Sequence, residues 1–379
     1  MGAAILLLAV LVAANVLSLA IAAGRLRRVP RMRPEAARPP VTIVRPVCGL
    51  EPHIEATLAS GFSLDYPDYE LVFCAASPRD PVIPLVERLI AAHPAVPARL
   101  IVGDVPVSAN PKLNNCVRGW EEASHDWIVL ADSNVLMPRD YVQQLQAAWR
   151  PNTGLVCSTP VGSSPDGFWA ELECAFLNTL QARWQYAGEA LGFGFAQGKS
   201  MLWHRPFLEE HGGIRALAAE IAEDAAATKL VRRAGRRVHL VDAPFQQPLG
   251  RRTLAQVWHR QARWARLRRV TFPLFFAPEI FTSAILPILG GLALGLAGET
   301  GAAALLLFGA ALWYAAEMGL AVKQGWFASP RLLLAFLVRD ALLPFLWASV
   351  WFRSQTVWRG NRMDIQSDDP VLTPNGAPV

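Results

Sequence analysis

The chain has few charged residues and few cysteines for its length. Only 18% of its 379 residues are Asp, Glu, Lys or Arg, whereas 53% are hydrophobic, and the mean hydropathy is +0.25. This balance is too apolar for an ordinary soluble protein and too charged for a protein wholly embedded in a bilayer, so we expect a soluble domain joined to membrane segments. The five cysteines are odd in number and form no Cys-x-x-Cys pair, which favours reduced packing residues over a disulfide framework or a zinc site.

Two nucleotide- and metal-binding patterns are also missing. The seven histidines show neither His-x-x-x-His nor His-Glu-x-x-His spacing, which argues against a histidine metal site. Gly198-Lys199-Ser200 matches the end of a P-loop, but Phe193 stands where that motif requires its first glycine. Hydrolysis of a nucleotide by a P-loop is therefore not expected, and Lys199 stays a candidate contact for a phosphate or an acceptor.

The net charge of +5 comes largely from basic clusters beside apolar segments, in residues 25–33, 251–269 and 353–362. Nucleic acid also attracts such clusters. Their position next to apolar runs instead favours anionic lipid headgroups and the positive-inside rule. We expect a bilayer as partner and no nucleic acid.

The first apolar run, residues 3–23, contains no charge. At about 1.5 Å per residue such a helix reaches roughly 30 Å, the thickness of one bilayer core. Because the basic residues follow the run, we predict a transmembrane signal anchor over residues 1–24, then a basic linker over 25–40 on the cytoplasmic side. The alternative is a cleaved signal peptide, which would have its basic residues before a shorter apolar stretch.

Between residues 41 and 250 the chain alternates strand-like and helix-like runs, which predicts an α/β domain with a mostly parallel sheet. Ligands collect at the carboxyl ends of such strands. Asp80 and Asp132 each follow a predicted strand, although Asp132 alone also fits a turn cap. The predicted strands are Val41–Arg45, Tyr69–Ala75, Arg99–Val102, Trp127–Ala131, Gly154–Ser158 and Ser200–His204, and the predicted helices are Pro81–His93, Lys112–Ala123, Tyr141–Trp149 and Phe168–Tyr186.

Most of the chain between residues 251 and 352 is predicted to lie on or in the membrane. Residues 251–272 mix Trp and Arg as an amphipathic interfacial helix does. Residues 273–322 form a predicted transmembrane hairpin. Residues 331–352 contain Arg339-Asp340 near their centre, and since each charge costs about 3 kcal/mol in a bilayer, we interpret this segment as a re-entrant or membrane helix bent at Pro344. A cytoplasmic tail, 353–379, follows.

Over about residues 40–270 the chain resembles the ceramide glucosyltransferases, which are GT-A, family 2-like or family 21 glycosyltransferases, here of a bacterial type. The most discriminating motif is Asn110-Pro-Lys-Leu-Asn-Asn115. The resemblance implies a GT-A fold and inverting transfer of glucose from UDP-glucose to the primary hydroxyl of ceramide. The other motifs that carry it are Val41–Pro46, Cys48–Pro52, Leu64–Pro67, Asp80-Pro81, Asp132-Ser-Asn134, Ala222-Glu-Asp224 and Arg260-x-x-Arg263-Trp264.

Carried over residue by residue, the resemblance makes Asp80 a nucleotide contact and Asp132 the ligand of a divalent metal, Mg²⁺ or Mn²⁺. Asp224 matches the general base. Arg260, Arg263 and Trp264 match the motif near the diphosphate and the acceptor. The remaining predicted substrate-binding residues are Lys112, Asn115, Lys199 and Glu223.

Three positions depart from that pattern. Asn134 stands where many relatives outside the ceramide branch have a second Asp, so the metal is expected to have one protein carboxylate and to use phosphate oxygens. Ser77 and Arg79 replace acidic or polar residues of eukaryotic relatives, which leaves the donor sugar open.

Chemistry agrees with a base at Asp224, since an alkyl hydroxyl is a poor nucleophile until its proton is removed. A neighbouring Glu223 and an apolar edge would raise the pKa of Asp224 toward that role. The alternative is a helix N-terminal carboxylate stabilised by the helix dipole. Gln181–Trp184 repeats the letters of Gln261–Trp264 but lacks the arginine cluster, so we assign it to packing or acceptor contact.

Membrane segments placed directly after the motifs favour a lipid acceptor over a growing polysaccharide. We expect a multi-pass protein of the inner (cytoplasmic) membrane with its catalytic domain in the cytoplasm. Two alternatives remain open. One is transfer of galactose, glucuronic acid or N-acetylglucosamine from a UDP-sugar to diacylglycerol or a hopanoid; the other is a non-catalytic membrane scaffold of the same fold.

Overall fold

The computed structural model describes residues 2–30, 38–351, 355–358 and 361–364. The chain divides into two compact units, described separately here. The sheet unit comprises Val29–Pro160 and Leu191–Pro248, and the helical unit comprises Met1–Arg28, Val161–Ala190 and Leu249–Gln366. The predicted tail, 353–379, lies mostly outside the described residues.

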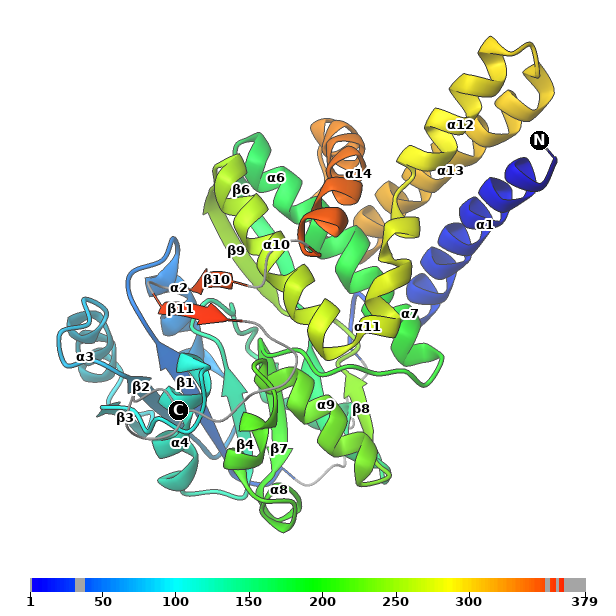
Figure 1. Ribbon diagram of the computed structural model, residues 1–379. Helices are drawn as coiled ribbons and strands as arrows, with labels where there is room; N and C mark the ends of the chain where they lie inside the picture. Colours follow the sequence, from blue (N-terminus) through cyan, green and yellow to red (C-terminus); the bar gives the residue numbers. More distant parts are fainter. Residues whose placement is uncertain (1, 31–37, 352–354, 359–360, 365–379) are drawn as a thin grey trace. The chain divides into compact units, whose positions relative to one another are not determined.

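A seven-stranded sheet forms the centre of the sheet unit, in the order β3-β2-β1-β4-β7-β5-β8 (Figure 1). Neighbouring strands run parallel except for β7, which is antiparallel to both β4 and β5. The prediction of an α/β fold with a mostly parallel sheet is confirmed. The strands are β1 (Val41–Val47), β2 (Tyr69–Ala75), β3 (Ala98–Val102), β4 (Trp127–Ala131), β5 (Thr153–Ser158), β7 (Ser200–His204) and β8 (Arg237–Leu240).

The central strands are buried on both faces. Every residue of β1, β2 and β5 is buried, which explains why apolar and polar residues do not alternate regularly in these strands. Their side chains pack with those of flanking helices into one large core. The helices of this unit are α2 (Ile54–Ala59), η1 (Ser60–Ser63), α3 (Ile83–Ala92), α4 (Pro111–Glu121), α5 (Tyr141–Ala147), α8 (Arg205–Glu210), η3 (Ile214–Ala219) and α9 (Glu223–Arg233).

The helical unit contains the apolar segments of the chain. Two short pairs of strands, β6 with β9 and the antiparallel β10 with β11, accompany its helices. The predicted helix Phe168–Tyr186 is continuous here but includes a π-helical stretch, η2. The elements are α1 (Gly2–Arg25), β6 (Val161–Asp166), α6 (Phe168–Cys174), η2 (Ala175–Ala182), α7 (Arg183–Ala190), β9 (Gln246–Arg251), α10 (Leu254–Thr271), α11 (Pro273–Phe276), η4 (Ala277–Thr282), α12 (Ile285–Leu296), α13 (Thr300–Gln324), α14 (Arg331–Ser349), β10 (Gln355–Trp358) and β11 (Asn361–Asp364).

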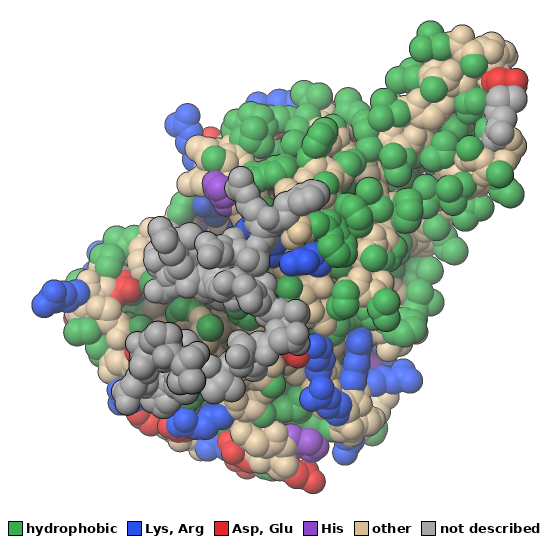
Figure 2. Space-filling view, viewed as in Figure 1, with side chains coloured by type: hydrophobic (Ala, Val, Ile, Leu, Met, Phe, Trp, Pro, Cys, Tyr) green, Lys and Arg blue, Asp and Glu red, His purple; other side chains and the backbone are tan. Residues whose placement is uncertain are grey.

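Three of the described helices, α1, α13 and α14, are long and apolar enough to cross a membrane, and α11–η4 with α12 forms a further candidate bent by 41°. Hydrophobic side chains cover α12 and α13 (Figure 2). The membrane helices expected at both ends of the chain are thereby confirmed, and the protein is a membrane protein. Exposed apolar residues on α12 and α13 include Leu289, Leu292, Leu296, Leu305, Phe308 and Leu312.

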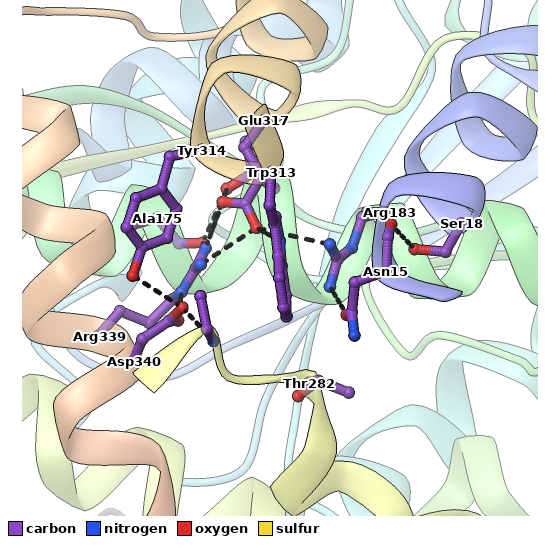
Figure 3. A network of polar contacts seen from close by, with 12 residues as sticks. Asn15, Ser18, Ala175, Arg183, Thr282, Trp313, Tyr314, Glu317, Arg339 and Asp340 are labelled. Carbon is purple, nitrogen blue, oxygen red and sulfur yellow. Dashed lines mark hydrogen bonds and ion pairs between the residues drawn. The ribbon is translucent and has the colours of Figure 1, made fainter. Parts of the chain in front are cut away.

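The two charges that complicated the prediction for α14 are fully buried inside the protein (Figure 3). Arg339 donates to Glu317 of α13 at 2.8 Å and to the adjacent Asp340 at 2.7 Å. Arg183 lies 3.5 Å from Glu317, and its guanidinium donates to Asn15 of α1 at 3.2 Å. Because these charges face partners and not lipid, their cost does not prevent α14 from spanning a bilayer.

Candidate active site

Loops after β1, β2 and β4 lie at the carboxyl edge of the sheet, as parallel strands require. Because β7 runs antiparallel, its first residue lies at this same edge. The register pairs Ala131 with Ser200, and the backbone N–H of Asp132 donates to the Lys199 carbonyl at 3.0 Å. Strand pairing therefore places Lys199 directly beside Asp132.

Two lysines bind the Asp132 carboxylate. Lys112 Nζ lies 2.7 Å from one carboxylate oxygen and Lys199 Nζ lies 2.7 Å from the other. Burial alone would raise the pKa of Asp132, but the two ammonium groups hold it well below its usual range. Asp132 is thus a carboxylate at any physiological pH, and it is surrounded by positive charge.

The motif at 110–115 explains how Lys112 reaches this position. Asn110 caps α4, since its side-chain oxygen accepts the backbone N–H of Lys112 at 3.0 Å. Pro111 occupies the first helical turn, where its lack of an N–H costs nothing. The other end of the Asn110 amide donates to Glu223 at 2.6 Å. Asn110 therefore both caps α4 and contacts the charged cluster.

Lys112 connects the sheet edge to α9. Its ammonium lies 2.6 Å from Glu223 Oε1 and also donates to the Gly198 carbonyl. Burial would lower the pKa of Lys112, but Asp132 and Glu223 raise it above its usual value. Lys112 is therefore a permanent cation shared by two carboxylates.

Asp224 follows Glu223 in the first turn of α9. Its Oδ2 accepts the backbone N–H of Gly198 at 3.1 Å. Burial, and then the charge of Glu223, raise the pKa of Asp224 to about 6. Asp224 thus lies at a helix N-terminus, as one interpretation of the sequence had it, and also has the titration that a general base needs near neutral pH.

The side-chain oxygen of Asn134 points to Lys199, one of the two lysines that bind Asp132. Its amide nitrogen donates to Glu51 at 3.0 Å, and its Oδ1 accepts from Lys199 at 3.0 Å. Behind these loops the buried Arg45 of β1 donates to the Asp132, Ser133 and Val135 carbonyls at 3.1–3.2 Å. The loop after β4 is therefore fixed from beneath by a charged residue of the sheet.

The two remaining sheet-unit residues of the prediction make internal contacts. Asp80 accepts the backbone N–H groups of Gly49 at 2.9 Å and Val82 at 3.0 Å, so it joins the loops after β1 and β2. Asn115 is buried, and its amide donates to the Cys74 carbonyl at 2.6 Å. Substrate contact by these two residues stays a prediction.

Arg260, Arg263 and Trp264 lie on α10 in the helical unit. The Arg260 guanidinium lies 2.7 Å from the buried Glu173 of α6 and 4.7 Å from the centroid of the Trp264 ring. Helix α10 begins with a capping box at Thr253. This motif therefore has a rigid arginine–aromatic pair supported by a carboxylate from another helix.

The segment Gln181–Trp184, which has the same sequence as Gln261–Trp264, lies at the junction of η2 and α7 in the helical unit. Gln181 donates to Gln261 at 2.7 Å, so the two glutamines of the two repeats bond to each other. Arg183 is buried in the charged network of α1, α13 and α14. These contacts agree with packing, one of the two roles that the sequence suggested for this segment; the other was contact with the acceptor.

Residues 8–371 match the sequence profile of glycosyl transferase family 21. The chain belongs to this family.

Relatives of this family 21 glycosyltransferase agree with the profile. Ceramide glucosyltransferase 1 of Caenorhabditis elegans is 26% identical over 351 residues, which cover 90% of this chain and 75% of that protein. Ceramide glucosyltransferase of Komagataella phaffii is 40% identical over 99 residues, 25% of this chain and 19% of that protein. The family expected from the motifs is confirmed.

One solved structure supports the fold of the family 21 glycosyltransferase. A mannosyltransferase of Pyrobaculum calidifontis, in complex with GDP-Man and Mn²⁺, has a TM-score of 0.50 and 20% identity over 89% of this chain and 98% of that one. The likeness confirms the GT-A-like fold.

Four residues at the site of this family 21 enzyme were not predicted to act there: Arg45, Glu51, Asn110 and Gly198. Arg45, Glu51 and Asn110 lie within motifs that carried the family resemblance, and this was the available signal for them. Gly198 was noticed only as part of an incomplete P-loop. An added Cβ at 198 would lie 2.7 Å from Glu223 Oε1 and 3.0 Å from Lys112 Nζ, so any larger residue there would displace these two charged groups.

Proposed function

We propose that this glycosyltransferase transfers glucose from UDP-glucose to the primary hydroxyl of ceramide, with inversion, at the cytoplasmic face of the inner membrane. The observation that carries the proposal is a carboxylate with a pKa of about 6, Asp224, held beside the charged cluster of Asp132, Lys112 and Lys199. The names of the curated relatives supply the substrate class. Basic residues directly after α1 favour the cytoplasmic side.

Asp224 would accept the proton of the acceptor hydroxyl. At neutral pH a carboxyl group with a pKa near 6 is mostly ionised yet basic enough to take a proton in the transition state. A single displacement with such a base inverts the anomeric carbon. Glu223 keeps that pKa raised, and Gly198 orients the carboxylate.

A divalent cation fits the loop after β4. Among the described residues, no three His, Cys, Asp or Glu side chains cluster as a metal site. The Lys199 ammonium nevertheless lies between Asp132 Oδ2 and Asn134 Oδ1, so these two oxygens already bind a cation. Oxygen ligands suit Mg²⁺ and Mn²⁺. When bound, the metal would supply positive charge for the departing diphosphate.

The other predicted residues take roles around the donor in this proposal. Asp80 would contact the nucleotide, while Lys112 and Lys199 would offer ammonium groups to the phosphates. Arg260, Arg263 and Trp264 are proposed to serve the diphosphate and the acceptor, and Glu223 and Asn115 to support substrate binding. Apolar helices such as α13 would retain a lipid acceptor at the membrane.

The test is transfer of label from UDP-glucose to lipid in membranes that contain the protein, Mg²⁺ or Mn²⁺ and either ceramide or diacylglycerol. Asp224→Asn is the matched control because it keeps the size of the side chain and removes its basicity. Glucosylceramide from the wild type alone supports the proposal. Transfer to diacylglycerol, or from another UDP-sugar only, would keep the mechanism and replace the substrate, and no transfer with any pair would favour a scaffold.

A further inference from the structure

We propose that Lys199 competes with the divalent cation for Asp132 and Asn134, and thereby couples binding of the metal to binding of the nucleotide diphosphate. This inference rests on the proposed function, because the metal and the nucleotide belong to it. Lys199 would be a specificity-determining residue that makes metal binding depend on the donor.

The competition follows from distances. Lys199 Nζ lies 2.7 Å from Asp132 Oδ2 and 3.0 Å from Asn134 Oδ1. A divalent cation that bound both oxygens would take the space between them, where the ammonium lies, so the two cations cannot occupy that position at one time. The two cations exclude each other from one position.

The competing position is fixed by the surrounding chain. Glu51 accepts the amide nitrogen of Asn134 at 3.0 Å, which leaves Asn134 Oδ1 turned toward Lys199. The backbone of Lys199 is bonded to the N–H of Asp132 at 3.0 Å. The ammonium is therefore held near these oxygens by the sheet itself.

Lys112 has further partners in the cluster besides Asp132. Its ammonium also binds Glu223 at 2.6 Å and the Gly198 carbonyl. Loss of Asp132 would leave Lys112 with these partners, so it can stay in place when a metal takes Asp132. Lys199, in contrast, contacts both oxygens that are proposed to bind the metal, Asp132 Oδ2 and Asn134 Oδ1.

Charge decides when the exchange takes place. The cluster has two ammonium groups and up to three carboxylates, those of Asp132, Glu223 and Asp224. A divalent cation alone would add positive charge beside two lysines. A diphosphate brings negative charge and acceptor oxygens for the displaced ammonium. Metal and nucleotide should therefore favour each other's binding, and this coupling is reciprocal.

The test measures Mn²⁺ binding to the full chain in detergent micelles by the electron paramagnetic resonance signal of free Mn²⁺, with and without UDP. No sugar or lipid acceptor is present. In the wild type we expect UDP to tighten Mn²⁺ binding. In Lys199→Met we expect the Kd for Mn²⁺ without UDP to fall about tenfold, which corresponds to about 1.4 kcal/mol, and the tightening by UDP to shrink.

Three further variants sharpen the result. Lys199→Gln repeats the test with a polar side chain, in case Lys199→Met does not fold. Lys199→Arg retains the positive charge and should behave as the wild type does. Lys229→Met removes another lysine of the sheet unit, which pairs with Glu220 at 2.6 Å, and should change nothing.

Equal or weaker Mn²⁺ binding by both neutral variants would overturn the inference and leave the proposed transfer reaction intact. Absence of Mn²⁺ binding by the wild type, even with UDP, would refute the metal part of the proposed function and the inference with it. Failure of the lipid assay has no bearing on this measurement, because no acceptor takes part in it.

Discussion

The backbone N–H of Gly198 donates to Asp224 Oδ2 at 3.1 Å, which joins the turn before β7 to the first turn of α9. The Gly198 carbonyl accepts from Lys112 on its other side. One residue without a side chain therefore contacts both the proposed base and the cation beside it.

Replacement of Gly198 by alanine should disturb both neighbours. The added Cβ would lie 2.7 Å from Glu223 Oε1 and 3.0 Å from Lys112 Nζ, so these side chains must move. We expect the variant to lose about 1–3 kcal/mol of stability, as overpacked sites do, and kcat to fall at least about tenfold. Thermal unfolding and steady-state transfer rates measure the two effects.

Gly301→Ala is the control for that substitution, because an added Cβ at position 301 has nothing within 4 Å. It should leave both quantities near wild type. A Gly198→Ala enzyme with full activity would show that the close approach at 198 has no role in positioning Asp224.

The pH dependence of kcat/KM, which reports the titrating groups of the free enzyme, should show an acid limb near pH 6. The pKa of Asp224 is raised to about 6, so the carboxyl group is protonated below that pH and cannot accept the proton of the acceptor. The rate should fall about tenfold per pH unit below the limb and be level above about pH 7. Asp224→Asn should lower kcat by about 100-fold to 10,000-fold while UDP still binds.

Glu223→Gln provides a second test of the same limb. Burial is the first cause of the raised pKa of Asp224 and the charge of Glu223 is the second. Without that negative neighbour the pKa of Asp224 should decrease, so the acid limb should move to lower pH. A limb that stays in place, or that persists in Asp224→Asn, would assign it to another group.

Six of the seven strands of the sheet, all except β8, and the first two aspartates could be predicted because their signals are local. Long apolar runs mark strands buried on both faces, and a polar residue directly after such a run lies at the sheet edge. The direction of β7 has no local signal. The pairing of Lys199 with Asp132 depends on that direction, so the sequence alone offered Lys199 only as a general phosphate contact.

Long-range polar contacts also have no local signal in the sequence. Arg339 and Asp340 are adjacent in sequence, but their partners include Glu317, 22 residues away from Arg339, and the backbone of Ala284. From the sequence alone, the cost of two charges facing lipid favoured a re-entrant helix for this segment. In the structure they are buried charges inside a bundle, a context that hydropathy along one segment does not contain.

Arg339→Met should destabilise the helical unit. It removes the guanidinium that binds Glu317 and Asp340, both fully buried, and leaves their charges poorly compensated. Loss of one partner from a buried pair costs about 3–5 kcal/mol. Thermal unfolding in detergent micelles should show this decrease. The exposed Lys323 gives the control Lys323→Met, with a change within about 0.5 kcal/mol; a decrease below about 1 kcal/mol for Arg339→Met would show that the network is not required for stability.

Glu173→Gln should test whether Glu173 orients Arg260 for its proposed contact with the donor. Glu173 is buried and binds Arg260 at 2.7 Å and Arg252 at 3.2 Å, so its loss leaves two guanidinium groups without their shared carboxylate. We expect kcat/KM for UDP-glucose to fall about tenfold because Arg260 loses its orientation. Arg252→Met, which leaves the Arg260 pair intact, should have a smaller effect. If Arg260→Ala lowers kcat/KM but Glu173→Gln does not, then other contacts, such as the packing of Arg260 over Trp264, orient the guanidinium.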